Sequence, residues 1–559
     1  MADNHRLSYS CCPSTTPYIY ETIPDRLRHL AAADPDREAF VFYDFNKQRK
    51  SLTRKQLLDQ TTIAAENFVK YGVEKGSTVA ICMTNSLEML TSNLGVIMAG
   101  GVPFYVSANL KDGSDLAEFI NNLEAKLLII DTNKGDENWK VLENIWPEGQ
   151  SRSKVTPCLG MVICNGNIDR ENETRKSLSS FQQKNSDTKI KLPNIQPEDT
   201  LAFFCTSGST GKPKEVVYTH FGILNWTKSS NKQLNITEKS VFFCDRTFSW
   251  VLGFPRTYVT EGATRVFVDT KLSISGKHSD FLTDIIKAEC CDVVYLPGYM
   301  VVDILKNPDV SEKFNKVQSI FLSGERIQNA NYQAVKAQLC TDVKSFYGTT
   351  ESGGVSEYSS TSGDAFEDGI IGKPLEGCEF KVVDENGDVV PIDTQGELCV
   401  RSPFRFVTYR GMEELFREVV DAQDWFHTGD MAHFRQDGNC VIGGRKKEMI
   451  SIGTNKFFPW SIEKVLKNIP GAENAFAVGV PDTRLGQVVC ACVLPKQGTA
   501  LSESDVKKFC DETFLEKSTA FGVTVKPVYK IILDKVPLTV SGKIDRRTIG
   551  ILAKKKLGL

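Results

Sequence analysis

Apolar residues recur along this chain with two periods, one typical of helices and one typical of buried strands. Between Thr53 and Tyr71 they return every three or four positions, which predicts a helix with one buried face. Thr53 is suited to cap the start of this helix and Gly72 to end it. The predicted buried face consists of Leu57, Leu58, Ala64, Ala65 and Phe68.

Short apolar runs predict buried strands between such helices. These runs cover residues 79–83, 126–130, 201–205, 293–296 and 320–322, and further helices are predicted up to Gly100 and over residues 281–288. Strands that alternate with helices predict an α/β architecture with mainly parallel sheets. Residues 133–199 are rich in Asn, Lys, Ser and Asp and lack clear periodicity. They are therefore predicted to form a solvent-exposed insertion.

The length of the chain predicts more than one domain. Its 559 residues are several times the roughly 150 residues of a common domain. The pattern breaks near Gly443 and Gly444, after which a βαβ-like pattern resumes to the end of the sequence. We therefore predict an N-terminal domain over residues 1–443 and a C-terminal domain over residues 444–559, which is large enough for its own core.

Composition and charge argue against several classes of protein. Lys and Arg number 67 against 70 Asp and Glu, so the net charge of −3 disfavours nucleic-acid binding through an overall positive field. No apolar run approaches the roughly 18 residues of a transmembrane helix. The 16 cysteines are spread along the chain without a CxxC pair. This spacing predicts isolated thiols in a reducing compartment rather than a disulfide framework or a metal site.

The ends of the sequence carry no standard targeting signal. The first residues lack the apolar core of a secretory signal, and the last three are Leu-Gly-Leu rather than Ser-Lys-Leu. We therefore expect a cytoplasmic protein, with peroxisomal or mitochondrial association as the alternatives.

A loop rich in glycine, hydroxyl groups and lysine follows the predicted strand 201–205. Its residues are Thr206, Ser207, Gly208, Ser209, Thr210, Gly211, Lys212, Pro213 and Lys214. Two residues separate its glycines and a proline follows Lys212, so the spacing differs from a Walker A loop. The residues alone fit either an anion-binding loop or a polar surface turn. The position after a buried strand favours phosphate binding, because ligands collect at that end of α/β sheets.

Five later segments strengthen this interpretation, and together with the loop they resemble the adenylate-forming superfamily. The superfamily includes acyl-CoA synthetases, aryl-CoA ligases, beetle luciferases and the adenylation domains of peptide synthetases. The segments are Tyr347–Glu351, Gly396–Arg401, Thr428–Asp430, Gly444–Ile450 and Pro537–Ile544. The resemblance implies a large α/β N-terminal domain with parallel-rich sheets flanked by helices and a small β-barrel. It also implies a smaller, mobile α+β C-terminal domain.

The resemblance implies ATP, Mg²⁺ and CoA as cofactors and a small carboxylic acid as substrate. The acid attacks the α-phosphorus of ATP, pyrophosphate leaves, and a thiol then displaces AMP. Such a reaction needs cations and N–H donors around the phosphates. The catalytic residues implied are Thr350 for a phosphate oxygen, Glu351 for Mg²⁺, Arg445 for ribose or phosphate, and Lys543 for the α-phosphate and the carboxylate.

The resemblance assigns the remaining ATP contacts to residues on either side of these. Tyr347 is implied to stack on adenine and Asp430 to accept hydrogen bonds from the ribose hydroxyls. Further implied ATP contacts are Gly324, Glu325, Arg326, Gly348 and Thr349. Lys447 matches the hinge position of the superfamily, and the segment with Ser451 and Gly453 is implied to face the active site when CoA enters.

Two features bear on the identity of the acid. Trp250 stands where relatives gate the substrate pocket, and its bulk is expected to shorten or gate the acyl tunnel. Ser249 replaces the Asp of amino-acid-activating relatives, which disfavours an α-amino acid. Gly353 and Gly354 are expected to leave room for an apolar chain, which favours a fatty or aryl acid.

One departure from the superfamily pattern raises an alternative. Glu215 stands where the phosphate loop usually has glycine, and a carboxylate there is expected to weaken ATP binding unless it turns away or pairs with Lys212. The sequence thus predicts an acyl-CoA ligase. The alternatives are an adenylate-forming enzyme with another acceptor, such as a luciferase-type monooxygenase, and a non-catalytic nucleotide-binding relative.

Overall fold

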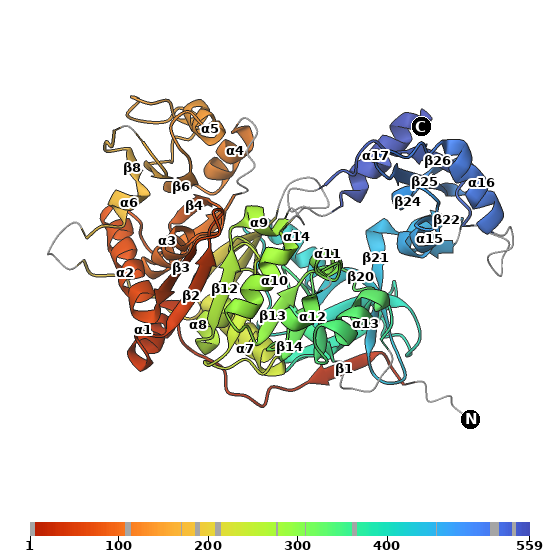
Figure 1. Cartoon of the computed structure of the whole chain (residues 1–559), viewed down its shortest axis with the longest axis horizontal. Helices are drawn as coiled ribbons and strands as arrows, with labels where there is room; N and C mark the ends of the chain where they lie inside the picture. The colour runs from red at the N-terminus through yellow and green to blue at the C-terminus, as the bar shows by residue number, and fades with distance from the viewer. Residues whose placement is uncertain are drawn as a thin grey trace.

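The protein is described from a computed structural model, in which two α/β layers form the large part of the chain and a small α+β unit follows (Figure 1). The structure describes residues 6–106, 113–168, 170–184, 190–206, 214–274, 278–307, 309–359, 366–453, 455–514, 525–538 and 544–559.

The first sheet is almost entirely parallel. Its order is β10 (Lys214–Thr219), β9 (Thr200–Thr206), β5 (Val102–Tyr105), β4 (Thr78–Cys82), β6 (Leu127–Asp131), β7 (Met161–Asn165) and β8 (Arg175–Ser177). Its helices are α2 (Arg54–Lys70), α3 (Leu87–Met98), α4 (Ser114–Asn122), α5 (Glu137–Ile145) and α6 (Leu178–Phe181). All five residues of β4 are buried, as expected for a parallel strand covered on both faces.

The second sheet has a parallel centre and an antiparallel end. Its order is β1 (Tyr9–Cys12), β18 (Cys378–Val383), β19 (Gly396–Arg401), β20 (Phe426–Phe434), β21 (Cys440–Arg445), β17 (Ile370–Pro374), β16 (Gly353–Ser359), β15 (Val343–Thr349), β14 (Ser319–Leu322), β13 (Val293–Leu296), β11 (Val241–Phe243), β12 (Thr264–Val268), β2 (Glu38–Tyr43) and β3 (Arg49–Thr53). Strands β15, β14, β13, β11, β12 and β2 pair in parallel.

Helices cover this second sheet and connect its strands. They are α1 (Ile23–Ala33), α7 (His220–Gln233), α8 (Arg256–Glu261), α9 (Thr270–Ile274), α10 (Ser279–Ala288), α11 (Gly298–Ile304), α12 (Val310–Lys313), α13 (Asn329–Gln338) and α14 (Glu413–Val419). No helix within the described ranges is both long enough and apolar enough to cross a membrane.

The described residues of the C-terminal unit form a separate small sheet with three helices. Its strands are β22 (Ile450–Ile452), β23 (Asn455–Phe457), β24 (Ala472–Asp482), β25 (Gly486–Pro495) and β26 (Tyr529–Ile532), and its helices are α15 (Pro459–Leu466), α16 (Glu503–Thr513) and α17 (Arg546–Leu557). Strand β21 still pairs with β20 as far as Arg445. The change from one sheet to the next therefore falls between Arg445 and Ile450, just after the predicted domain boundary at residue 444.

Most of the predicted elements are confirmed. Helix α2 starts after Thr53, whose side chain and that of Gln56 each accept a hydrogen bond from the other residue's backbone N–H. Leu57, Ala64 and Phe68 are buried on its inner face. The 16 cysteines are free thiols, 11 of them buried.

The prediction of an exposed insertion over residues 133–199 is wrong. Helix α5 and strands β7 and β8 lie in this stretch, and β7 is buried against β6. Residues 133–199 contribute to the hydrophobic core through a few short apolar segments, such as Met161–Asn165, and through Trp139 and Trp146. Long polar connections separate these segments, so the apolar residues show no regular spacing over the roughly 11–18 residues that a pattern-based prediction uses.

Candidate active site

Residues from three of the sequence segments meet at the end of the second sheet. The hydroxyl of Tyr347 donates a hydrogen bond to Asp430 Oδ2 at 2.6 Å. Strands β20 and β21 place Asp430 opposite Arg445, and Arg445 Nε lies 3.0 Å from Asp430 Oδ1. Arg445 Nη1 also donates to the carbonyl oxygen of Thr428 at 2.9 Å. The geometry therefore joins the predicted adenine, ribose and phosphate contacts.

The Asp430 carboxylate is buried, and its partners hold it in one orientation. Burial raises its pKa above the ordinary value, although Arg445 and the Tyr347 hydroxyl act in the opposite direction. Each carboxylate oxygen has two acceptor directions, so one protein partner per oxygen leaves room for a hydroxyl donor. This arrangement suits a ribose with two neighbouring hydroxyl groups.

A second cluster contains Glu351 and Lys214. The hydroxyl of Tyr409 donates to Glu351 Oε1 at 2.9 Å, and Lys214 Nζ lies 4.9 Å from the centre of the Tyr409 ring. Burial lowers the pKa of Lys214, although the charge of Glu351 acts in the opposite direction. Tyr409 was not predicted from the sequence. Tyr409 stands in a largely apolar stretch before helix α14. Core aromatic residues are common in such stretches, so the sequence does not distinguish Tyr409 from one.

The two clusters belong to one site. The positive charge of Arg445 contributes to lowering the pKa of Lys214, and the negative charge of Glu351 contributes to raising the pKa of Asp430. Charges that act on each other in this way lie within about one Debye length, roughly 8–10 Å. Lys214, Glu351 and Asp430 therefore line the same region, as the sequence analysis requires.

Residues Thr349 and Thr350 form the turn between these clusters. The Thr349 backbone N–H donates to the Ser352 hydroxyl at 3.0 Å, which closes the turn between β15 and β16. A Cβ at Gly348 would lie 2.1 Å from the carbonyl oxygen of Gly353, so only glycine allows the two strands to approach here. The turn thus presents the Thr350 and Glu351 side chains beyond the end of the sheet.

The phosphate loop is described only at its two ends. Thr206 ends β9 and Lys214 begins β10, and the two residues are cross-strand partners. The other predicted loop residues and the predicted catalytic lysine lie outside the described residues: Ser207, Gly208, Ser209, Thr210, Gly211, Lys212 and Lys543.

Glu215 does not face the predicted phosphate site. It follows Lys214 in strand β10, so the two side chains point to opposite faces of the strand. Burial raises the pKa of Glu215, and the positive charge of Arg410 acts against this rise. The carboxylate therefore points away from Lys214, and the positive charge of Arg410 acts on it, which argues against a conflict with phosphate.

The segment with Gly324, Glu325 and Arg326 leaves the sheet beside Tyr347. Leu322 of β14 pairs with Ser345 of β15, so both chains pass beyond the sheet at the same edge. Glu325 accepts a hydrogen bond from the Tyr299 N–H at 3.1 Å.

Arg326 itself is engaged elsewhere. Its terminal nitrogens donate to the carbonyl oxygens of Ile442 and Asp368 at 2.8 and 2.6 Å, and its guanidinium stacks on Trp460 at 3.9 Å. These contacts tie the second sheet to helix α15. They give no support to the predicted ATP contact of Arg326.

The prediction that Gly353 and Gly354 leave room for an apolar chain is wrong. A Cβ at Gly353 would lie 2.8 Å from Trp226 Cδ2, and one at Gly354 would lie 2.8 Å from Trp226 Nε1. The two glycines allow β16 to approach this indole closely. Trp250 lies in the turn after β11, where the Arg246 guanidinium is 5.9 Å from its ring.

The predicted hinge and CoA residues begin the C-terminal unit. Lys447 lies in the short 3-10 helix η2 (Lys446–Glu448). The Ser451 N–H donates to Gln487 Oε1 at 2.9 Å, and Gly453 has a φ of +60°. Their roles stay predictions.

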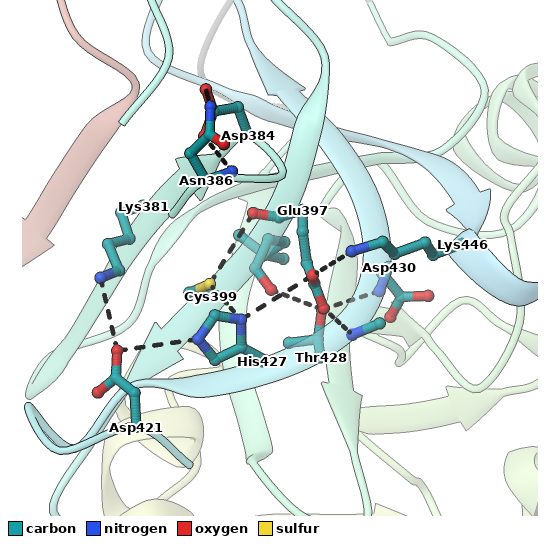
Figure 2. A network of polar contacts seen from close by, with 12 residues as sticks. Lys381, Asp384, Asn386, Glu397, Cys399, Asp421, His427, Thr428, Asp430 and Lys446 are labelled. Atoms are coloured by element: carbon teal, nitrogen blue, oxygen red, sulfur yellow. Dashed lines mark hydrogen bonds and ion pairs between the residues drawn. The ribbon is translucent and has the colours of Figure 1, made fainter. Parts of the chain in front are cut away.

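A polar network that the sequence did not predict supports the turn before Asp430 (Figure 2). Glu397 accepts a hydrogen bond from the Gly429 N–H at 3.2 Å and pairs with Lys446 Nζ at 2.9 Å. His427 Nδ1 lies 3.4 Å from Cys399 Sγ and 3.9 Å from Glu397 Oε2. Contact with Cys399 and Glu397 raises the pKa of His427 to about 10. Burial alone would raise the pKa of Glu397, but His427 and Lys446 outweigh it and lower this pKa to about 2.

Comparison with known proteins decides the family. A family model described as AMP-binding enzyme matches residues 27–410, and one described as AMP-binding enzyme C-terminal domain matches residues 461–543. The chain belongs to the AMP-binding enzyme family. The resemblance to the adenylate-forming superfamily is thereby confirmed. Two units in this order, a large α/β part followed by a small α+β part, are the fold expected of a member.

Among relatives of this AMP-binding enzyme, the rat mitochondrial medium-chain acyl-CoA ligase ACSF2 is 26% identical over 97% of this chain and 89% of its own length. The putative acyl-CoA synthetase YngI of Bacillus subtilis is 26% identical over 94% of this chain and 96% of its own. The ATP-bound structure of MatB from Rhodopseudomonas palustris has a TM-score of 0.80 at 19% identity, and covers 96% of this chain and 100% of that one. The anthranilate CoA ligase AuaEII with anthranoyl-AMP has a TM-score of 0.79 at 21% identity, with coverages of 97% and 99%.

Proposed function

We propose that this AMP-binding enzyme is an ATP-dependent carboxylic acid–CoA ligase that works through an acyl-AMP. The observation that carries the proposal is the joining of Tyr347, Asp430 and Arg445 with Glu351 and Lys214 in one region. In this proposal Asp430 and Tyr347 bind the nucleoside. Lys214 and Arg445 face the phosphates, whose charge would also favour the protonated form of the partly buried lysine.

Glu351 suits the Mg²⁺ of the proposal. One of its carboxylate oxygens accepts from Tyr409, and the other has no partner among the described residues. Within the described ranges no group of three or more His, Cys, Asp or Glu side chains is placed to hold a metal. A single carboxylate is sufficient for Mg²⁺ bound mainly through substrate phosphates. When bound, the ion would neutralise charge on the phosphate oxygens.

The two half-reactions are assigned to two positions of the C-terminal unit. Lys543 would approach the α-phosphate and the carboxylate in the first, and the segment with Ser451 and Gly453 would face the site for thiol attack in the second. Residues 444–559 would move as a domain, with Lys447 at the hinge. The breaks between the sheets after Arg445 and the few junction contacts of Arg326 and Trp460 support such a motion.

The range of acids that we propose as substrates is wider than the fatty and aryl acids that the sequence favoured. The case for a fatty or aryl acid rested partly on space beside Gly353 and Gly354, which Trp226 occupies. The names of the ACSF2 relatives support a medium-chain monocarboxylic acid as one candidate. We propose a cytoplasmic location for the reaction, with mitochondrial association as the alternative that these relatives suggest.

Pyrophosphate exchange and AMP release test the proposal together. We expect exchange of pyrophosphate into ATP that needs Mg²⁺ and a suitable acid. We also expect AMP release that needs CoA in addition. Exchange without CoA-dependent AMP release would favour an adenylate-forming enzyme with another acceptor. Absence of exchange over a broad acid panel would favour a non-catalytic relative, although the position of Glu215 removes the main argument for one.

A further inference from the structure

Three arginines near helix α8 are buried, and only one of them lacks hydrogen-bond partners for its side chain among the described residues. Arg54, Arg256 and Arg265 are 1, 5 and 2% exposed. Arg265 donates to the carbonyl oxygens of Cys244 at 3.0 Å and Arg246 at 2.8 Å, and Arg54 donates to that of Gly262 at 2.9 Å.

Arg256 Nε and Nη1 are buried and have no such partner. The contact of the Arg256 guanidinium is instead with the face of Trp226, at 4.5 Å from the ring centre.

Arg256 forms no ion pair with any carboxylate in the part of the chain that the structure describes. Burial lowers its pKa to about 10, and the neighbouring Arg265 acts in the same direction. The groups that act against this shift include Cys244, Tyr295 and Tyr218. The pKa of each tyrosine is raised, so both phenols are neutral near pH 7. A buried cation without an anion or an acceptor is unfavourable, so such a group in a native structure calls for a bound water, a bound ion or a functional role.

Trp226 supplies a second unpartnered donor at the same place. Its Nε1 is buried without a hydrogen-bond partner in the described part of the chain. The indole lies on helix α7, which contacts both α8 and β16. Two donors on adjacent helices, one of them a cation, form a set that fits an anion with several acceptor oxygens.

This donor set lies directly behind the proposed site of the reaction. A Cβ at Gly354 would lie 2.8 Å from Trp226 Nε1, and Gly354 is three residues after Glu351. Tyr218 stacks on Trp226 with ring centres 6.4 Å apart, and its hydroxyl donates to the carbonyl oxygen of Glu351 at 3.3 Å. In the proposed ligase, an acid with its reacting carboxylate at the phosphates would extend from Glu351 in the direction of Trp226 and Arg256.

We propose that Arg256 and Trp226 bind the far end of the acid substrate, and that this end carries a second carboxylate. The inference rests on the proposed ligase function, because it takes the region beyond Glu351 as the acid site. A carboxylate accepts two parallel hydrogen bonds from Nε and a terminal nitrogen of a guanidinium. Its charge compensates the buried cation, whereas an apolar end would leave both donors unpaired.

The test compares acids of equal length with one and two carboxylates. Pyrophosphate exchange is measured for butanoate, hexanoate, octanoate and 4-methylbenzoate, and for butanedioate, hexanedioate, octanedioate and terephthalate. We expect the preferred diacid to exceed its monoacid counterpart by about tenfold or more in kcat/KM, because a site built to bind a polar group rejects analogues that lack it. A wild-type enzyme that prefers the monoacids would overturn the inference and leave the ligase function intact.

Substitution of Arg256 identifies the residue responsible. Arg256→Met keeps an unbranched, apolar stem and removes the charge and its donors, so it is expected to lose about tenfold or more on the diacid and to keep or gain activity on the monoacid. Trp226→Phe keeps the ring and removes only Nε1, so the loss on the diacid is expected to be smaller. Equal losses on both classes of acid would contradict a specific role for these donors.

Thermal unfolding separates a specificity effect from misfolding. Arg256→Met removes an unpaired charge, so its melting temperature is expected to stay equal to that of the wild type or to rise. Arg265→Met, the matched control, leaves several carbonyl oxygens without donors and is expected to melt at a lower temperature. With MgATP present, the preferred diacid is expected to raise the melting temperature of the wild type and not that of Arg256→Met. If no acid supports exchange and none shifts melting, the ligase proposal and the inference both fail.

Discussion

The two ends of the proposed site differ in how far the protein satisfies its own charges. At the nucleotide end, Asp430 has Tyr347 and Arg445, and Glu351 has Tyr409. At the acid end, Arg256 and the indole N–H of Trp226 have no hydrogen-bond partners among the described residues. Partners hold the charged side chains at the nucleotide end in place before a ligand binds. This arrangement is expected at a site that binds the same nucleotide in every turnover. Unpaired donors instead discriminate between ligands, because only a complementary group satisfies them.

The largest expected effect concerns Lys543, the cation that the C-terminal unit is proposed to bring to the nucleotide end. We expect Lys543→Ala to reduce acid-dependent pyrophosphate exchange by about 10²- to 10³-fold, the usual loss when one charge-stabilising donor is removed. Thioester formation from supplied acyl-AMP and CoA is expected to stay near the wild-type rate. Equal loss of both half-reactions would contradict the separate roles given to the two faces of this unit.

The next effect tests the pairing at the nucleotide end directly. Asp430→Asn keeps the shape and removes the charge that Arg445 and the ribose hydroxyls share. Hydrogen bonds to charged groups are worth about 1.5–3 kcal/mol, so the KM for ATP is expected to rise by about 10- to 100-fold. The KM for the acid is expected to change little, and an equal rise in both constants would show that Asp430 organises the whole site instead.

A smaller effect concerns the network behind Asp430. The pKa of His427 is raised to about 10 from an ordinary value near 6.5, so the folded protein binds the proton more tightly than the unfolded chain. The stabilisation is complete below pH 6.5 and is lost as the pH rises through 10. His427→Gln is expected to lower the free energy of unfolding by about 1 kcal/mol at pH 6, a figure reduced for solvent screening of a partly exposed pair.

Melting curves of the wild type and His427→Gln between pH 6 and 10.5 measure this difference. The gap is expected to narrow with rising pH. A gap that is constant over this range would show that packing of the ring, rather than its charge, supports the turn.

The smallest effect is expected at Glu215. Because its carboxylate lies on the opposite face of β10 from Lys214 and near Arg410, Glu215→Gly is expected to leave the KM for ATP unchanged within about twofold, the range of a surface charge. Glu215→Gln is the control that keeps the side-chain volume. A KM that falls severalfold in both variants would restore the earlier expectation that this carboxylate opposes phosphate binding.

The sequence predicted the parts of the site that short segments encode. Tyr347, Glu351, Asp430 and Arg445 stand in such segments, and strand order brings them together. The network of Glu397, His427 and Lys446 was not predicted, because its members are distant along the chain and each is ordinary alone.

The errors have a common physical cause. Gly353 and Gly354 were expected to border open space, but whether a glycine faces space or a neighbour depends on a helix more than 120 residues earlier. Arg256 begins the short, largely buried helix α8, and the sequence gives no sign that its side chain lacks partners. Tertiary packing decides both, and local patterns carry no information about it.

The most direct test of the central claim follows the oxygen atoms of the acid. The preferred acid, labelled with ¹⁸O in the carboxylate that reacts, is incubated with ATP, Mg²⁺, CoA and the enzyme, and the products are analysed by mass spectrometry. Attack on the α-phosphorus places one labelled oxygen in AMP and leaves one in the acyl-CoA, which is the predicted result. Label in inorganic phosphate, with AMP unlabelled, would show attack at another phosphorus and would contradict the account.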